Sequence, residues 1–226
     1  MMSQTEPERI RQVYAARAGG WRYSMKNASF VARTNDLAGY VRSLLDRHLI
    51  PLSRCRVLEV GCGSGHWLRQ FVRWGAQPDR IAGVDLIPRS LHAADRSVNG
   101  SLCLSIANGT ALPFRTGSMD LVSQFIMMSS VLDPGIRREI ASEMLRVLAP
   151  GGSILWYDMA VNNPFNPNVR GIDRRELQQL FPHCTIDRHR ITLIPQLARV
   201  LPITITRWLE RLTVLNTFYL AVIRPR

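Results

Sequence analysis

The segment VLEVGCGSGHW, residues 57–67, constrains the fold of this chain more than any other. An apolar run with strand character leads into three glycines at alternate positions, and a helix-like segment follows. Glycine has no Cβ, so such a loop turns sharply and lets backbone amides face a ligand at the carboxyl end of a strand. The segment therefore predicts an open α/β sheet with a ligand at that edge.

The residue after the third glycine limits which class of ligand the loop can bind. A dinucleotide fingerprint, G-x-G-x-x-G, needs glycine at position 66, where this chain has His66. The pattern found is E-x-G-x-G-x-G, from Glu59 to Gly65. Asp85, 20 residues beyond Gly65, ends the next predicted strand and can accept hydrogen bonds from both ribose hydroxyls. Together they favour an adenosine ligand without phosphates, although Asp85 alone could also be a turn or cap residue.

Strand-like runs alternate with helical periodicity after the glycine loop, which is typical of a parallel sheet. The predicted strands are 56–60, 80–85, 101–108, 119–125 and 153–158, and the predicted helices are 66–75, 89–98, 135–148 and 173–181. The last strands, 185–194 and 216–225, are expected to pair antiparallel around a helical insertion at about 195–213. We predict an α/β, Rossmann-like seven-stranded sheet, mostly parallel with an antiparallel last strand, and helices on both faces.

Ordered motifs between about residues 55 and 160 resemble those of the class I S-adenosylmethionine-dependent methyltransferases, of the type 11 group. VLEVGCGSG resembles their first motif, and GVDLIP resembles the second. ANGTALPFRTGSMDLV resembles the third and fourth motifs, and EMLRVLAPGGSIL resembles the following helix and fifth strand. The resemblance implies S-adenosylmethionine as the cofactor.

The resemblance also implies roles for the glycine loop and the strand end beside it. Glu59 would help to hold the loop and the methionine amino group. Asp85 would bind the ribose hydroxyls, and Leu86 would pack on the adenine. The loop residues assigned to the cofactor, whose glycines would pass close under its methionine and ribose portions, are Gly61, Cys62, Gly63 and Gly65.

Four further residues are assigned to the cofactor by resemblance. Asn108 stands where the family usually has Asp beside the adenine amine, and an amide oxygen can still accept that hydrogen bond without a negative charge. A simple turn residue is the alternative for Asn108. The backbone amide of Gly109 could meet the adenine ring, and Gln124 would line the methionine and transfer site. Phe125, next in the chain, would line the same site.

The acceptor side is less constrained. Ser129 stands where related small-molecule enzymes often have His, which removes the usual candidate for the base, so Asp158 is the predicted catalytic base. Asn162 and Asn163, in the polar loop after the fifth strand, suit a hydroxyl-rich ligand, or else they build turns. With Tyr14, in the segment before the first strand, the predicted substrate residues are Tyr14, Ser129, Asn162 and Asn163.

The chain divides into an N-terminal segment and a catalytic domain. Residues 1–50 are expected to form two helices with an aromatic-rich link and to act as a helical lid over the substrate, with an ordinary packing helix as the alternative. Residues 51–226 are expected to form the methyltransferase domain. Within it, the insertion mixes aliphatic residues with Arg199, Arg207 and Trp208, so it could cover a lipidic substrate, touch a membrane surface, or simply pack.

Charge and cysteine content bear on partners and location. A net charge of +12 favours anionic partners, but no compact run of four or more basic residues occurs. The four cysteines are far apart and form no CxxC pair, which argues against a zinc site or a disulfide framework. No metal is expected. The first residues lack the apolar core of a secretory signal, which predicts a cytoplasmic protein, with membrane association left open.

These observations predict an S-adenosylmethionine-dependent methyltransferase that methylates an oxygen of a sugar, a glycolipid or another small-molecule acceptor. Motifs that resemble those of base-amino methylases or of cysteine-nucleophile pyrimidine methylases do not follow the fourth strand. An RNA methyltransferase, suggested by the charge, and a non-catalytic cofactor-binding protein, suggested by Asn108 and Ser129, are the alternatives. The oligomeric state is left open.

Overall fold

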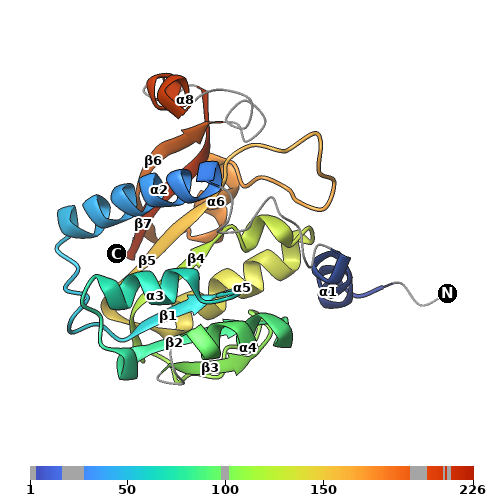
Figure 1. The fold of residues 1–226 in the computed structure, drawn as a ribbon. Coiled ribbons are helices and arrows are strands. Elements are labelled where there is room, and N and C mark those ends of the chain that lie inside the picture. The colour runs from blue at the N-terminus through green and yellow to red at the C-terminus, as the bar shows by residue number, and fades with distance from the viewer. Residues whose placement is uncertain (1–3, 17–27, 98–101, 194–202, 211, 213–214) are drawn as a thin grey trace.

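The computed structural model describes residues 4–16, 28–97, 102–193, 203–210, 212 and 215–226. Its centre is a seven-stranded sheet in the order β3-β2-β1-β4-β5-β7-β6 (Figure 1). The strands are β1 (Val57–Val60), β2 (Ile81–Asp85), β3 (Cys103–Ile106), β4 (Met119–Phe125), β5 (Leu148–Met159), β6 (Cys184–Leu193) and β7 (Asn216–Pro225).

The pairing of the strands confirms the predicted sheet. Strands β1 to β5 pair in parallel, whereas β7 runs antiparallel to both β5 and β6. The chain order reverses between β1 and β4, and open α/β sheets bind ligands at the carboxyl ends of the strands beside such a switch point. The glycine loop follows β1 directly, so the sequence motif lies at this position.

Helices cover both faces of the sheet, as predicted. Neighbouring residues of one strand face opposite sides, so Val57 belongs to the buried cluster under α2 and α3, and Leu58 to the cluster under α5 and α6. The helices are α1 (Glu6–Ala16), α2 (Ala28–Arg47), α3 (His66–Arg73), α4 (Pro88–Ser97), α5 (Pro134–Val147), α6 (Arg174–Leu180) and α8 (Ile203–Glu210), with 3₁₀ turns η2 (Pro78–Arg80) and η3 (Met128–Ser130).

Helix starts follow local chemistry. The side chain of Asp133 accepts hydrogen bonds from the amides of Gly135 and Ile136, and Pro134 occupies the first turn of α5. Asp173 caps α6 in the same way through the amide of Glu176. These caps fix the first turns of α5 and α6.

Strand β5 is longer than predicted. We expected the APGG segment to end a helix and the strand to begin at 153, but β5 begins at Leu148, which pairs with Met119 of β4. Gly151 adopts a left-handed φ of 75°, and the register with β4 shifts between Met119 and Leu121. The chain therefore pairs with β4 on both sides of the glycine turn, which a turn signal alone does not reveal.

Two predicted segments are described only in part. The aromatic-rich link expected before α2, with Trp21 and Tyr23, lies outside the described residues, and so does most of the insertion, including Arg199. Helix α8 is the part of the insertion that the structure describes. No helix among the described residues is long and apolar enough to cross a membrane.

Candidate active site

The glycine loop turns tightly between β1 and α3. Gly61, Gly63 and Gly65 have left-handed φ values of 74°, 53° and 73°, which side chains other than glycine adopt with strain. The amides of Gly61 and Cys62 donate to the carbonyl of Val84, at 2.8 and 3.0 Å, and tie the loop to the end of β2. A Cβ on Gly61 would overlap the side chain of Met127. The loop is thus held between β2 and the segment after β4.

Asp85 ends β2 and faces this loop. Its carboxylate accepts the amide of Gly63 at 2.7 Å and the amide of Ile87 at 2.8 Å. Burial raises the pKa of Asp85, and the two amides oppose that rise. A carboxylate offers about four acceptor positions, so it keeps capacity for a ligand's hydroxyl groups.

A cavity of about 150 Å³ opens at the carboxyl ends of β1, β2 and β4. Eight of the residues predicted from the sequence line it: Tyr14, Gly61, Gly63, Asp85, Leu86, Asn108, Gly109 and Phe125. Residues that the prediction missed include Ile10, Ile87, Ile126, Met127 and Ser130. The structure therefore brings the loop, the end of β2 and the segment after β3 to one cavity.

Three residues predicted to bind the cofactor lie behind the lining. Glu59 is buried within β1, where burial and nearby Asp85 hold its pKa well above the ordinary value, and one of its carboxyl oxygens has no hydrogen-bond partner among the described residues. Burial likewise raises the pKa of the Cys62 thiol. Gly65 precedes α3 and packs close to Ala94. None of the three lines the cavity.

Gln124 supports the cavity wall from within. Its fully buried side chain accepts the amides of Met127 and Met128 at 3.1 and 3.4 Å and donates to the carbonyl of Tyr157 at 3.4 Å. These bonds hold the turn after β4, in which Ile126 has a left-handed φ of 57°. A β-branched residue is rarely found there, and Ile126 lines the cavity. The residues after Gln124 line the site in its place.

Asp158 and Ser129 are hydrogen-bonded to each other and do not line the cavity. Asp158 is fully buried, and its two oxygens accept the amides of Ser129 at 3.0 Å and Met159 at 2.8 Å. Burial raises the pKa of Asp158 to about 6. Neither residue lines the cavity, whereas Ser130, next in the chain, does.

The predicted substrate asparagines close turns. Asn162 accepts the amide of Gly171 and Asn163 accepts the amide of Phe165, each at 3.0 Å. Asn162 borders a different groove, together with Arg170 and Glu176. This placement agrees with the turn-building alternative.

Helix α1 contributes Ile10 and Tyr14 to the wall of the cavity. The hydroxyl of Tyr14 lies 3.0 Å from that of Ser130, and Arg9 donates to the carbonyl of Ser130 at 2.6 Å. Glu6 accepts the amide of Leu132 just before α5. Ile10 and Tyr14 are one helical turn apart and share the face that lines the cavity, a spacing that could have identified Ile10 from the sequence.

Comparison with known proteins identifies the domain. The family described as a methyltransferase domain matches residues 57–152, which span the loop, Asp85 and β4. Residues 57–152 therefore carry a methyltransferase domain, similar to those of the class I S-adenosylmethionine-dependent enzymes. An uncharacterized methyltransferase of Mycobacterium sp. (strain KMS) is 35% identical over 117 residues, which cover 51% of this chain and 43% of the relative.

A second relative and a solved structure are also similar to this chain. A demethylmenaquinone methyltransferase of Roseiflexus castenholzii is 29% identical over 158 residues, covering 67% of this chain and 63% of the relative. The [4+2]-cyclase SpnF, a solved structure, aligns over 98% of this chain and 97% of its own with a TM-score of 0.69 and 18% identity. The latter likeness concerns the fold alone. The methyltransferase of strain KMS is more than twice as long as its matched part, so this chain spans less than half of that relative.

Proposed function

We propose that this chain binds S-adenosylmethionine in the cavity beside the glycine loop and methylates a small-molecule acceptor that enters next to Tyr14 and Ser130. The observation that carries the proposal is the joint placement of Gly61, Gly63 and Asp85 around one cavity in a methyltransferase-family domain. The cofactor fits these residues because a ligand with a ribose but no phosphates needs a carboxylate and close-approaching backbone, and both are present.

The cofactor's parts have natural partners in the lining. The unfilled acceptor positions of Asp85 suit the two ribose hydroxyls. Leu86 and Ile87 offer apolar contact for the adenine ring, and Asn108 and Gly109 offer polar groups at its edge. Glu59, Cys62, Gly65 and Gln124 would act from behind, through the shape of the loop and of the turn after β4.

When bound, the cofactor supplies an electrophilic methyl group on a sulfonium. In methylation of a hydroxyl, the sulfur–carbon bond breaks as the oxygen–carbon bond forms, and the acceptor's proton passes to a base or to water. The chain's main contribution would be alignment of the two groups. Tyr14 and Ser130 are positioned to orient the acceptor oxygen.

Asp158 remains the base predicted from the sequence. A pKa of about 6 suits proton acceptance near neutral pH. Because both of its oxygens are bound by amides and it does not line the cavity, the geometry supports a positioning role through Ser129 better.

The acceptor side favours a small molecule with an apolar body and an oxygen to methylate. Ile10, Met127 and Val131 surround the hydroxyls of Tyr14 and Ser130, and α1 covers the opening. A glycolipid or another partly apolar acceptor suits this lining better than a free sugar, since Asn162 and Asn163 are committed to turns. A covered site of this kind also suits an RNA strand poorly.

The test is incubation with methyl-labelled S-adenosylmethionine and host extract, followed by separation into organic-soluble, water-soluble small-molecule and RNA fractions. We expect the label in a small-molecule fraction, and its loss with Asp85→Ala but not with Asp79→Ala, a change at an exposed turn residue. Label in RNA would favour the nucleic-acid alternative. Cofactor binding without labelled product in any fraction would favour a non-catalytic protein.

A further inference from the structure

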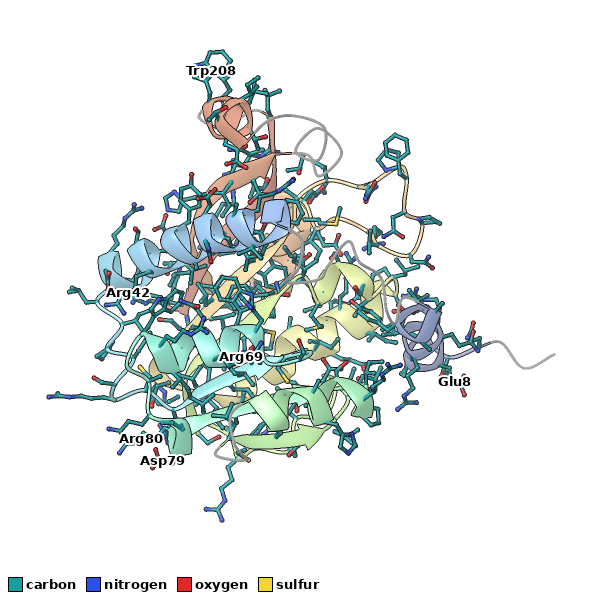
Figure 2. The ribbon with its side chains drawn as sticks, in the orientation of Figure 1. Glu8, Arg42, Arg69, Asp79, Arg80 and Trp208 are labelled. Atoms are coloured by element: carbon teal, nitrogen blue, oxygen red, sulfur yellow. The ribbon has the colours of Figure 1, made fainter. Side chains whose placement is uncertain are left out.

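Helix α8 exposes apolar side chains and buries a polar one, which is the reverse of an ordinary surface helix. Trp208 is 61% exposed and Ile205 is 45% exposed, whereas Thr206, on the opposite side of the helix, is only 1% exposed. Figure 2 shows Trp208 pointing away from the body at the far end of the molecule. A surface helix normally buries its apolar side and exposes its polar side, so α8 has an apolar face that the described part of the chain leaves uncovered.

The polar side of α8 holds it in this orientation. Thr206 and Glu210 border a small cleft together with Asp36 and Tyr40 of α2. The side-chain amide of Asn216, at the start of β7, donates to the backbone carbonyl of Glu210 at 2.8 Å. Because the side of α8 with Thr206 and Glu210 faces α2 and β7, the side with Ile205 and Trp208 faces away from the protein.

The apolar face extends beyond the helix and lies at the functional edge of the sheet. Leu212, just after α8, is also an exposed large apolar residue. Strand β6 precedes α8 and runs parallel to β5, since both are antiparallel to β7. The β6–β7 connection therefore leaves the sheet at the same edge as the cavity, at the outermost strand.

The sequence of this region is basic. The segment from 194 to 215 contains three arginines and one acidic residue, Glu210. The groove beside α8 is lined by Arg47 of α2 and by His189 and Arg190 of β6, together with Glu210 of α8. The whole chain has a net charge of +12. Anionic headgroups attract such a surface, and Trp is a side chain favoured at the boundary between headgroups and hydrocarbon.

We propose that the α8 face, formed by Ile205, Trp208 and Leu212, docks on the surface of an anionic lipid bilayer without crossing it. The few apolar side chains would insert at the headgroup level, and Arg47 and Arg190 of the neighbouring groove would add electrostatic attraction. This proposal is independent of the cofactor and of the acceptor.

Co-sedimentation with vesicles tests it. Wild-type protein should bind vesicles of phosphatidylcholine mixed with phosphatidylglycerol at least roughly tenfold more tightly than vesicles of phosphatidylcholine alone, and added salt should weaken the binding. The double variant Ile205→Ser/Trp208→Ser should lose roughly tenfold or more of that affinity. The matched control is Leu49→Ser, because Leu49 is 85% exposed but lies in the α2–β1 connection, which leads to the amino end of β1.

Three results would overturn the proposal: no binding of the wild type to either vesicle, equal binding by the double variant, or equal binding to neutral vesicles. Sedimentation velocity adds a fourth, because self-association that the double variant abolishes would assign the face to a second copy of the chain. Calorimetric binding of S-adenosylmethionine should be the same for the double variant and the wild type. That readout separates loss of membrane docking from misfolding and from failure of the proposed function.

Discussion

The two halves of the cavity, called the cofactor half and the acceptor half after the occupants proposed for them, are built differently. The cofactor half consists of backbone and short side chains that follow strand ends: the glycine loop after β1, Asp85 at the end of β2, and Asn108 after β3. The acceptor half depends on contacts between distant segments, such as that of Tyr14 with Ser130, which are 116 residues apart. The cofactor half is therefore fixed by local geometry, and the acceptor half by how α1 docks.

The difference extends to stability. The loop's glycines are confined by φ and by close neighbours such as Met127. Helix α1 has no buried residue and is attached through Glu6, Arg9 and Tyr14. A helix held mainly by partly exposed hydrogen bonds opens more readily than a buried loop, which suits a cover over an acceptor site.

Replacement of Gly61 should produce the largest effect and test the rigidity of the cofactor half. Gly61→Ala combines a strained left-handed φ with overlap of Met127, and should cost about 3–4 kcal/mol of unfolding free energy. Gly63→Ala is the matched comparison, because nothing lies within 4 Å of its added Cβ, and should cost about 1 kcal/mol. Urea unfolding measures both. Equal losses would show that the loop is less confined than the structure indicates.

The pH dependence of the unfolding free energy tests the role of buried Asp158, which holds the segment beside Ser130 in the acceptor half. The folded pKa of Asp158, about 6, lies above the ordinary value of 3.8, so its stabilising contribution is complete below about pH 4 and is lost as pH rises through 6. The contribution amounts to roughly 3 kcal/mol at most. The unfolding free energy of the wild type minus that of Asp158→Asn should fall by up to this amount between pH 4 and pH 7. A constant difference would mean that Asp158 does not titrate from a buried position.

Loss of Asp85 tests the ligand contact of the cofactor half. Asp85→Ala removes the proposed ribose acceptor and the anchor of the Gly63 amide. Affinity for S-adenosylmethionine should fall roughly 30- to 100-fold, corresponding to about 2–3 kcal/mol for hydrogen bonds to a charged group. Isothermal calorimetry measures the change, with Asp79→Ala as the control. Wild-type affinity in Asp85→Ala would place the cofactor elsewhere.

Tyr14→Phe should produce the smallest effect, and it separates the two halves. It removes the hydroxyl that meets Ser130 but keeps the ring, so turnover of the acceptor should fall roughly three- to tenfold, about 1 kcal/mol. The affinity for S-adenosylmethionine should remain within about twofold, since the change leaves Asp85 and the glycine loop intact. Parallel losses of turnover and cofactor affinity would contradict the division into halves.

The contrast between the locally built cofactor half and the acceptor half, which depends on distant contacts, explains what the sequence could predict. Glycines, prolines and apolar runs mark strand ends locally, so the amino-acid pattern alone predicts the sheet and the positions of Gly61, Gly63 and Asp85 at the cavity. The sequence left two roles open for Asn162 and Asn163, because the groups that their side chains bond, the amides of Gly171 and Phe165, are not visible as a pattern.

Other features could not be derived because they depend on packing. Periodicity shows that α8 has two faces but not which one points outward. The left-handed φ of Ile126 follows from the bonds that Gln124 makes to the next turn, and no local signal predicts it for a β-branched residue. The burial of Asp158 likewise depends on how η3 folds back on β5.

The central claim, that the glycine loop and Asp85 form a site for an adenosine ligand without phosphates, is tested most directly by calorimetry on the wild-type chain. Separate titrations with S-adenosylmethionine and with NAD⁺ should show saturable binding of one equivalent of S-adenosylmethionine and no binding of the dinucleotide. Absence of S-adenosylmethionine binding, or tighter binding of NAD⁺, would contradict the claim.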